Sequence, residues 1–236
     1  MTFRKILILF FITSIFSTAA QAEKPTMAVL DFRNNTAAYW WTGGVGRELA
    51  GMLTNELASG KKFSMVERQK LASVLDEQDL ADSGRVSGSK AAKFGKLVGA
   101  QYLVTATVSA YEKNVNNTGG GLSYRGVSLG GKKEKAYIAV DLRVVDSTTG
   151  EIVETRTVEA RTGGLGLGVG VNRRGFNGAL ANEKKTPTGK VIRAVVAEIR
   201  GYLECSMVKK SNKCLAAYAK KEEKRQKSLS EGISLD

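Results

Sequence analysis

The chain has 236 residues, a formal net charge of +13, two cysteines and no histidine. Without histidine it lacks the commonest zinc ligand and the commonest general base, so metal sites and catalytic triads are disfavoured and we expect no cofactor. The basic charge suits an anionic partner, such as lipid head groups, cell-wall polymers or an acidic client.

The N-terminus is typical of a secretory signal peptide over residues 1–22. Arg4 and Lys5 precede a short apolar run at residues 6–16, and the small-residue sequence AQA ends the segment. A retained membrane anchor is the alternative, although the run is short for a transmembrane helix. No cysteine lies near the expected cleavage site, so the sequence does not predict a lipoprotein. We therefore expect an exported protein, and no nucleic acid as its partner.

Short strands and helices alternate after this leader. Residues 27–32 and 63–67 have the composition of strands. Residues 45–59 carry apolar side chains at helical spacing, and further helices are expected at residues 69–78 and 90–98. This order predicts a sheet with helices packed against it.

The loop between the first strand and the first helix has an unusual composition. It contains both tryptophans of the chain together with asparagine, threonine and glycine. Packing on the core or on a subunit interface is one interpretation of such a cluster. We call this segment the aromatic loop, and its candidate functional residues are Asn34, Asn35, Tyr39, Trp40 and Trp41.

The second half of the chain predicts an antiparallel ladder followed by a helix. Residues 101–111, 136–145 and 151–161 have β-rich composition, and the sequence DSTTG at residues 146–150 forms a turn between the last two. Apolar residues at helical spacing then predict a helix from about residue 188 to residue 203.

A charged tail over residues 205–236 ends the chain, and from Ser211 it is either a solvated helix or a frayed end. In an oxidising compartment Cys205 and Cys214 could close a small loop and stabilise this end of the chain. The sequence leaves open whether they are joined, and their spacing has no metal signature.

Two glycine-rich excursions interrupt the ladder, at about residues 116–137 and 160–186. In the second, glycine alternates with apolar residues, as in a strand with one apolar face. Each excursion is either a lipid-facing hairpin or a flexible loop. The candidate lipid-facing residues are Leu165, Leu167, Val169 and Val171 in the second excursion, with Leu122 and Tyr124 in the first.

These elements predict an α+β fold over residues 23–204, with a mixed sheet, flanking helices and two extended β-hairpins. The order of these elements and their local sequences resemble the curli production assembly/transport component (CsgG) family over roughly residues 26–203. The stretches that carry the resemblance are FSMVER at 63–68, LASVLDEQ at 71–78, GAQYLV at 99–104, YEKNV at 111–115 and IAVDLRVVDSTTGEI at 138–152.

The resemblance implies a periplasmic domain that assembles into a homo-oligomeric ring at the outer membrane of a Gram-negative-type envelope. The paired hairpins of all subunits would close one transmembrane β-barrel, which satisfies every backbone group in lipid. Such a channel passively exports unfolded curli-like or other surface proteins, with periplasmic and extracellular accessory partners. The family's constriction loop corresponds to the aromatic loop, and the two excursions correspond to its membrane hairpins.

Three departures from the family pattern leave an alternative open. Lys132, Lys133 and Lys135 crowd the return of the first excursion, the return of the second is weakly apolar, and the lipoprotein cysteine is missing. The alternative is a non-pore periplasmic module that binds within a cell-envelope or surface-assembly machine. An enzyme is not expected, because Asp76 and Glu77 have the spacing of solvated helix charges rather than of an acid–base pair.

Overall fold

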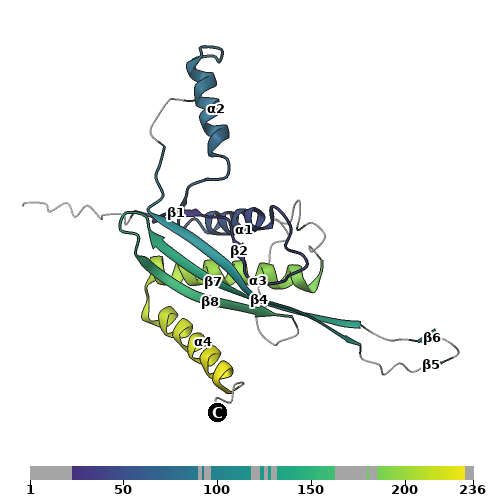
Figure 1. Ribbon diagram of the computed structural model, residues 1–236. Helices are drawn as coiled ribbons and strands as arrows, with labels where there is room; N and C mark the ends of the chain where they lie inside the picture. The colour runs from purple at the N-terminus through teal and green to yellow at the C-terminus, as the bar shows by residue number, and fades with distance from the viewer. Residues whose placement is uncertain are drawn as a thin grey trace, which may run out of the picture.

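The α+β domain and the root of one hairpin are described in the computed structural model (Figure 1). Helices cover one face of a mixed sheet, so the predicted sheet with flanking helices is confirmed. The structure describes residues 23–89, 92, 97–117, 123–124, 127–128, 132–162, 180 and 185–231.

Six of the described strands form the mixed sheet, in the order β3-β1-β4-β7-β8, with β2 also paired to β4. The three short strands pair in parallel, whereas β4, β7 and β8 form an antiparallel ladder. Strands β5 and β6 pair separately. The bounds are β1 Thr26–Val29, β2 Arg33–Asn34, β3 Ser64–Met65, β4 Tyr102–Asn117, β5 Ser123–Tyr124, β6 Val127–Ser128, β7 Lys132–Asp146 and β8 Ile152–Arg161.

The predicted strand at residues 27–32 divides into β1 and β2. The amide of Phe32 donates to the carbonyl of Gly46 instead of to a neighbouring strand, at 3.0 Å. The link between the two strands is therefore tied to the start of the first helix, and this tie positions the loop that follows β2.

The helices are α1 Val45–Ser59, α2 Leu71–Asp82, α3 Pro187–Leu203 and α4 Asn212–Glu231, and the π-helical turn η2 Glu204–Lys209 extends α3. Thr186 caps α3 by accepting a hydrogen bond from the amide of Gly189, and proline begins the helix. The apolar stripes of α1 and α3 are buried against the sheet and form the core with it. Among the described segments, no helix is long and apolar enough to cross a bilayer.

Two predicted helices differ in the structure. None of the twelve residues of α2, all described, is buried, although Leu71, Val74 and Leu75 have the spacing of a core-facing stripe. The helix expected at residues 90–98 is absent from its described residues 92, 97 and 98, and its other residues lie outside the described part of the chain.

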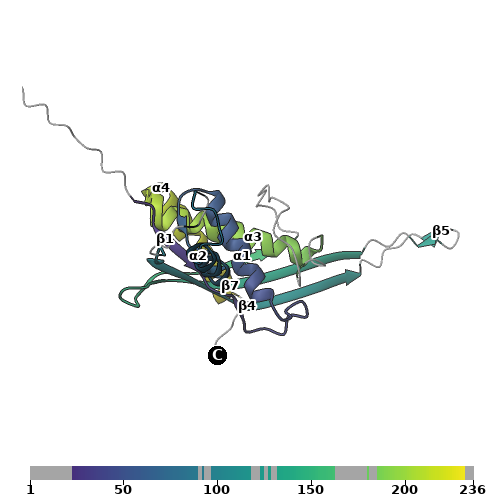
Figure 2. The ribbon, with the colours of Figure 1, turned by 90° about the horizontal axis from the view of Figure 1, so that it is seen from above.

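Strands β4 and β7 continue past their neighbours as a projecting hairpin (Figures 1 and 2). Strand β8 pairs with β7 up to Arg161 opposite Tyr137, whereas β4 and β7 stay paired to Asn117 opposite Lys132. Five residue pairs therefore lie beyond the sheet, which at strand rise adds about 17 Å of hairpin.

The second excursion begins at the same end of the sheet. The amide of Thr162 donates to the carbonyl of Ala136, and its hydroxyl accepts from the amide of Ala136, each at 2.8 Å. Of the return, the structure describes Lys185 and Thr186, which lead into α3, and Leu180, which is buried and whose amide donates to the Glu48 carboxylate. The candidate residues Leu165, Leu167, Val169 and Val171, and Leu122 of the first excursion, lie outside the described residues.

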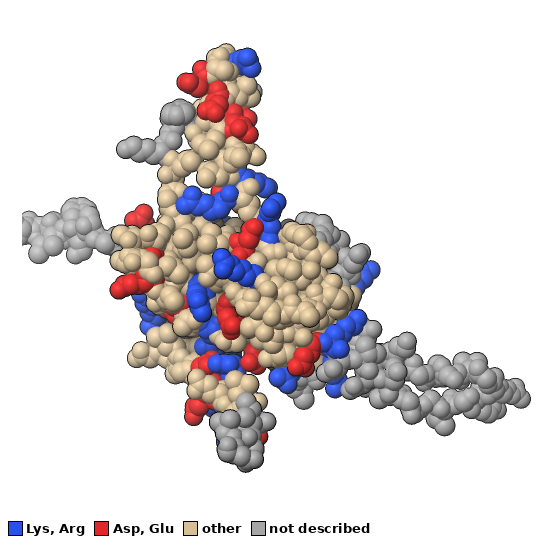
Figure 3. Space-filling view, viewed as in Figure 1, with Lys and Arg blue, Asp and Glu red and all other residues tan. Residues whose placement is uncertain are grey.

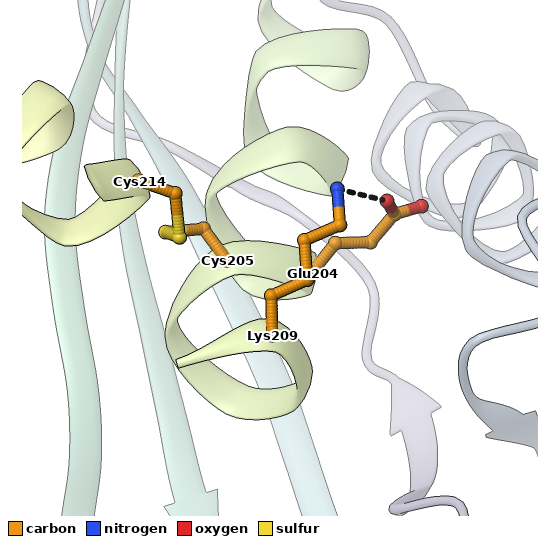
Figure 4. Close-up of a disulfide and its surroundings, with 4 residues drawn as sticks. All are labelled: Glu204, Cys205, Lys209 and Cys214. Atoms are coloured by element: carbon orange, nitrogen blue, oxygen red, sulfur yellow. Dashed lines mark ion pairs between the residues drawn. A yellow bond between two sulfur atoms is a disulfide. The ribbon is translucent and has the colours of Figure 1, made fainter. Parts of the chain in front are cut away.

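The tail is attached to the domain at the C-terminal end of α3. Cys205, in the buried part of η2, forms a disulfide with Cys214 in the first turn of α4 (Figure 4). Beside it, the carboxylate of Glu204 pairs with Lys209 at 3.5 Å and with Arg200 at 2.8 Å. The first part of the predicted tail is thus joined covalently to the core.

Candidate functional site

The aromatic loop, residues 34–44, lies between β2 and α1 and runs beside β4 (Figure 2). Asn34 forms its first turn: its side-chain oxygen accepts from the amide and the hydroxyl of Thr36, at 3.0 and 2.7 Å. Its amide group donates back to the carbonyl of Thr36. An asparagine that bonds its own backbone two residues on holds a turn, so the side chain of Asn34 is engaged within the loop.

Asn35, unlike the half-buried Asn34, is exposed. Its backbone amide donates to the carbonyl of Val108 at 3.0 Å, while the residue itself is exposed. Strand β4 therefore holds the backbone of Asn35 and leaves its side-chain amide open to solvent or to a partner.

The two tryptophans pack inward. Trp40 is 4% exposed and belongs to the hydrophobic core, where its ring centroid lies 5.5 Å from that of Tyr111 on β4. Trp41 is half-buried and lies 5.6 Å from Trp40. Burial of this size makes Trp40 an anchor for the loop.

Tyr39 points outward from the same loop and is 56% exposed. One edge rests against Tyr111, with ring centroids 6.0 Å apart, and the ammonium of Lys113 lies 5.3 Å from the Tyr39 ring. The Tyr111 and Tyr39 hydroxyls lie 2.8 and 3.5 Å from the hydroxyl of Thr188, in the first turn of α3. The exposed ring of Tyr39 is therefore supported by β4 and α3.

Three residues of this site escaped prediction from sequence: Tyr111, Lys113 and Thr188. Tyr111 was expected as the end of a strand and Thr188 as the start of a helix, and no spacing rule joins them to Tyr39. Only the pairing of β4 with β2, and the packing of α3 on β7, brings them together.

A polar hollow adjoins the loop on the sheet face away from α1 and α3. It encloses about 450 Å³, and Asn35, Thr105, Thr107, Asp141 and Arg143 are among the residues that line it. Among the described residues, no cluster of histidine, cysteine or acidic side chains could hold a metal ion. The hollow has the chemistry of a surface that forms hydrogen bonds with a polar partner.

A helix-covered sheet, a hairpin that projects beyond it and an aromatic loop at the hairpin's base define the class: an α+β domain with an extended β-arm. The particular family follows from comparison with known proteins. The model of the curli production assembly/transport component CsgG family matches residues 11–233, so the chain belongs to that family and the resemblance is confirmed.

Curated relatives support the same membership. The curli production assembly/transport components CsgG of Escherichia coli K12 and of Salmonella typhimurium LT2 are 30% identical to this chain over 115 residues. That segment is 47% of this chain and 42% of each relative, so the chain spans less than half the length of the relatives it matches.

Solved structures with a related arrangement are more distant. The hypothetical protein CT253 of Chlamydia trachomatis is 18% identical, with a TM-score of 0.41, and covers 76% of this chain and 98% of its own. The PelC dodecamer of Paraburkholderia phytofirmans is 13% identical, with a TM-score of 0.37 and coverage of 75% and 86%.

Proposed function

We propose that this protein is one subunit of an oligomeric secretion channel in the outer membrane. The ring exports unfolded curli-like or other surface proteins from the periplasm, with accessory proteins at its two ends and without any enzymatic step. Membership of the curli assembly/transport family supports a secretion role. The common exit point of the two excursions is the observation that carries the channel proposal.

That exit point suits a shared barrel. The first excursion joins β4 to β7, and the second leaves β8 at Thr162, which is hydrogen-bonded to Ala136 where the first hairpin leaves the sheet. Both hairpins can therefore extend side by side from one edge of the domain. Only a closed ring of such hairpins satisfies their backbone groups in lipid.

The polar root of the first hairpin has a place in this arrangement. Its sequence is KNVNN on β4 and KKEKA on β7, and lysine at mid-bilayer depth costs about 2–4 kcal/mol. We place this root, about 17 Å long, between the domain and the apolar part of the membrane. Leu122, Tyr124, Leu165, Leu167, Val169 and Val171 would face lipid farther out.

The exposed part of the aromatic loop would line the narrowest point of the passage. Tyr39 and Asn35 are exposed, whereas Trp40 is buried and Asn34 bonds within its own turn. We therefore divide the candidate residues: Tyr39 and Asn35 contact the extended client, and Asn34, Trp40 and Trp41 hold the loop in place. A ring of tyrosines around an axis can grip any extended chain by stacking.

A non-pore periplasmic module is the second candidate function. The polar hollow beside Asn35, together with the lysine-rich root of the hairpin, favours it, because both suit a polar protein partner rather than lipid. Under this alternative the chain would form no channel in a bilayer.

Single-channel recording in planar bilayers tests the proposal. Tyr39→Ala should raise conductance, because it widens the constriction, and should leave the free energy of unfolding almost unchanged. Trp40→Ala should lower that free energy by about 3–5 kcal/mol, because it empties part of the core. Tyr39→Phe is the matched control, since it keeps the ring and should keep the conductance. The channel proposal fails if the wild-type protein forms no channels. If Tyr39→Ala has the same conductance as the wild type, Tyr39 does not line the constriction, but the channel proposal itself stands.

A further inference from the structure

Helix α2 stands away from the domain, and none of the other described elements packs closely against it (Figure 1). None of its residues is buried, and Val74, Leu75 and Leu80 are 41%, 41% and 39% exposed. A helix of twelve residues is marginal in water on its own, because most helix stability in proteins comes from tertiary packing. The exposed side that carries Val74 and Leu75 is therefore available to a partner.

The charge of α2 indicates what kind of partner it fits. The helix carries Asp76, Glu77, Asp79 and Asp82 and contains no lysine or arginine, and Figure 3 shows these acidic groups gathered along it. None of the four forms an ion pair with another described residue. Such a surface attracts a basic partner.

One side of helix α4 is held against the β8 edge of the sheet. Besides the disulfide, the guanidinium of Arg156 on β8 lies 5.0 Å from the Tyr202 ring and 5.1 Å from the Tyr218 ring, and it donates to the Tyr218 carbonyl. Lys221 pairs with Glu198 on α3. Burial raises the pKa of Tyr218 to about 12, which reflects the partial enclosure of this ring where α4 meets the domain. These contacts fix which side of α4 faces outward.

A row of lysines runs along the side of α4 that makes none of these contacts, and Lys224, at its edge toward the sheet, also lines a groove with Arg156 and Glu159 of β8. Lys213, Lys220, Lys224 and Lys227 are spaced by seven, four and three residues, which places them on one side of a helix. All four are exposed, and only Lys227 has an ion pair with a described residue, at 3.7 Å to Glu231. Ala216 and Ala217, also exposed, lie near the start of this row.

The acidic and basic helices lie at opposite edges of one sheet. Helix α2 follows β3, the first strand in the sheet order, and α4 lies against β8, the last. Figure 1 shows the two helices on opposite sides of the domain. Complementary patches at opposite ends of one chain allow each copy to bind the next head to tail, and such contacts close into a ring when the rotation permits.

We propose that α2 of one copy binds the lysine row of α4 of the next copy. Val74 and Leu75 pack on Ala216, Ala217 and the aliphatic stems of the lysines, while the carboxylates of α2 pair with the ammonium groups. The occupant of both surfaces is a second copy of this chain, and the contact rests on the proposed oligomeric channel.

Charge reversal tests this contact in the full chain, purified with and without detergent and studied by sedimentation velocity. One variant carries Asp79→Lys and Asp82→Lys on α2, and the other carries Lys220→Glu and Lys224→Glu on α4. Each should raise the concentration needed for half-assembly about tenfold or more, because like charges then face each other. An equimolar mixture of the two should assemble, and so should one chain with all four substitutions.

The matched control is Lys24→Glu with Lys190→Glu, which makes the same charge change at exposed lysines away from α4. It should assemble as the wild type does. Far-UV circular dichroism checks that the helices remain folded in every variant.

The outcomes separate this contact from the proposed function. If the wild type assembles and either two-residue variant assembles equally well, the contact is wrong and the channel proposal stands. The contact is also wrong if the four-residue variant is folded but monomeric. A wild type that stays monomeric in both conditions would refute the contact and the ring together. If the α4 variant assembles normally but loses binding to anionic vesicles, the lysine row contacts lipid instead.

Discussion

Gly46 lies where helix α1 meets the link between β1 and β2, and this single residue controls how the aromatic loop is held. A Cβ atom here would overlap the carbonyl oxygen of Phe32 and lie 3.4 Å from the Trp41 ring. The Gly46 carbonyl also accepts the amide hydrogen bond of Phe32 at 3.0 Å. Only glycine allows the start of α1 and the loop to approach this closely.

Gly46→Ala should therefore lower the free energy of unfolding by about 1–3 kcal/mol, because the backbone must move to relieve the overlap. The near-ultraviolet signal of the two tryptophans should change with it. The matched control is Gly51→Ala in the same helix, where the nearest group is the side chain of Gln69 at 3.7 Å. That change should be neutral or should stabilise by about 0.5–1 kcal/mol. Urea unfolding compares the two, and equal effects would contradict the close-approach argument.

Helix α4 depends on its attachment rather than on its own sequence. It is strongly polar, none of its residues is buried, and the disulfide between Cys205 and Cys214 closes a loop with a sequence separation of nine. A Cβ atom at Gly201 of α3 would lie 2.8 Å from the Tyr218 hydroxyl, so the end of this α4 side chain lies close to the backbone of α3. The element that presents the lysine row is positioned by these contacts with the core.

Replacing Cys214 by alanine should lower the free energy of unfolding by about 2–3 kcal/mol, because the unfolded chain is no longer restrained by this small loop. Hydrogen exchange should become faster along α4 than along α3. Urea denaturation of the wild type with and without reductant provides the comparison, since the reduced wild type should match the variant. A reductant effect that persists in Cys214→Ala would show that the disulfide is not its cause.

The molecule as a whole combines a packed domain with a projecting arm, and the domain should fold without this arm. Beyond Lys113 opposite Ala136, the hairpin strands pair only with each other among the described strands. Among the arm residues whose burial is described, Ala136 at the base belongs to the core, whereas Lys113 and Lys135 are exposed. Folding and membrane association should therefore be separable.

A chain in which an Asn-Gly turn replaces residues 114–135 should test this separation. Its thermal midpoint should stay within a few degrees of the wild type, because removing a surface hairpin changes loop entropy only slightly. Its share in the membrane fraction should fall sharply, because one of the two lipid-facing hairpins is gone. Replacing the turn sequence DSTTG at residues 146–150 in the same way is the control, and its membrane fraction should not change. A trimmed chain that still forms channels would contradict the assignment of the first hairpin to the barrel.

Much of the fold could be read from local patterns. Helical spacing located α1 and α3 to within a residue or two, and β-rich runs separated by a DSTTG turn located β7 and β8. The break between β1 and β2 was not visible, because it depends on the hydrogen bond from Phe32 to Gly46 in a later element. Periodicity reports on neighbours in the chain, so it identifies elements better than their contacts.

The sequence alone predicted a basic α+β chain with two glycine-rich excursions and a resemblance to the curli assembly/transport family, because composition, periodicity and short sequence stretches are local properties. The tertiary structure decided which aromatic residue is available. Tyr39 and Trp40 are adjacent and chemically similar, yet Trp40 packs in the core and Tyr39 stands on Tyr111 and Thr188. The tertiary structure also leaves every residue of α2 unburied, although the apolar spacing of this helix resembles that of a buried one. Exposure depends on which distant segments the fold brings alongside, and no spacing within one segment contains that information.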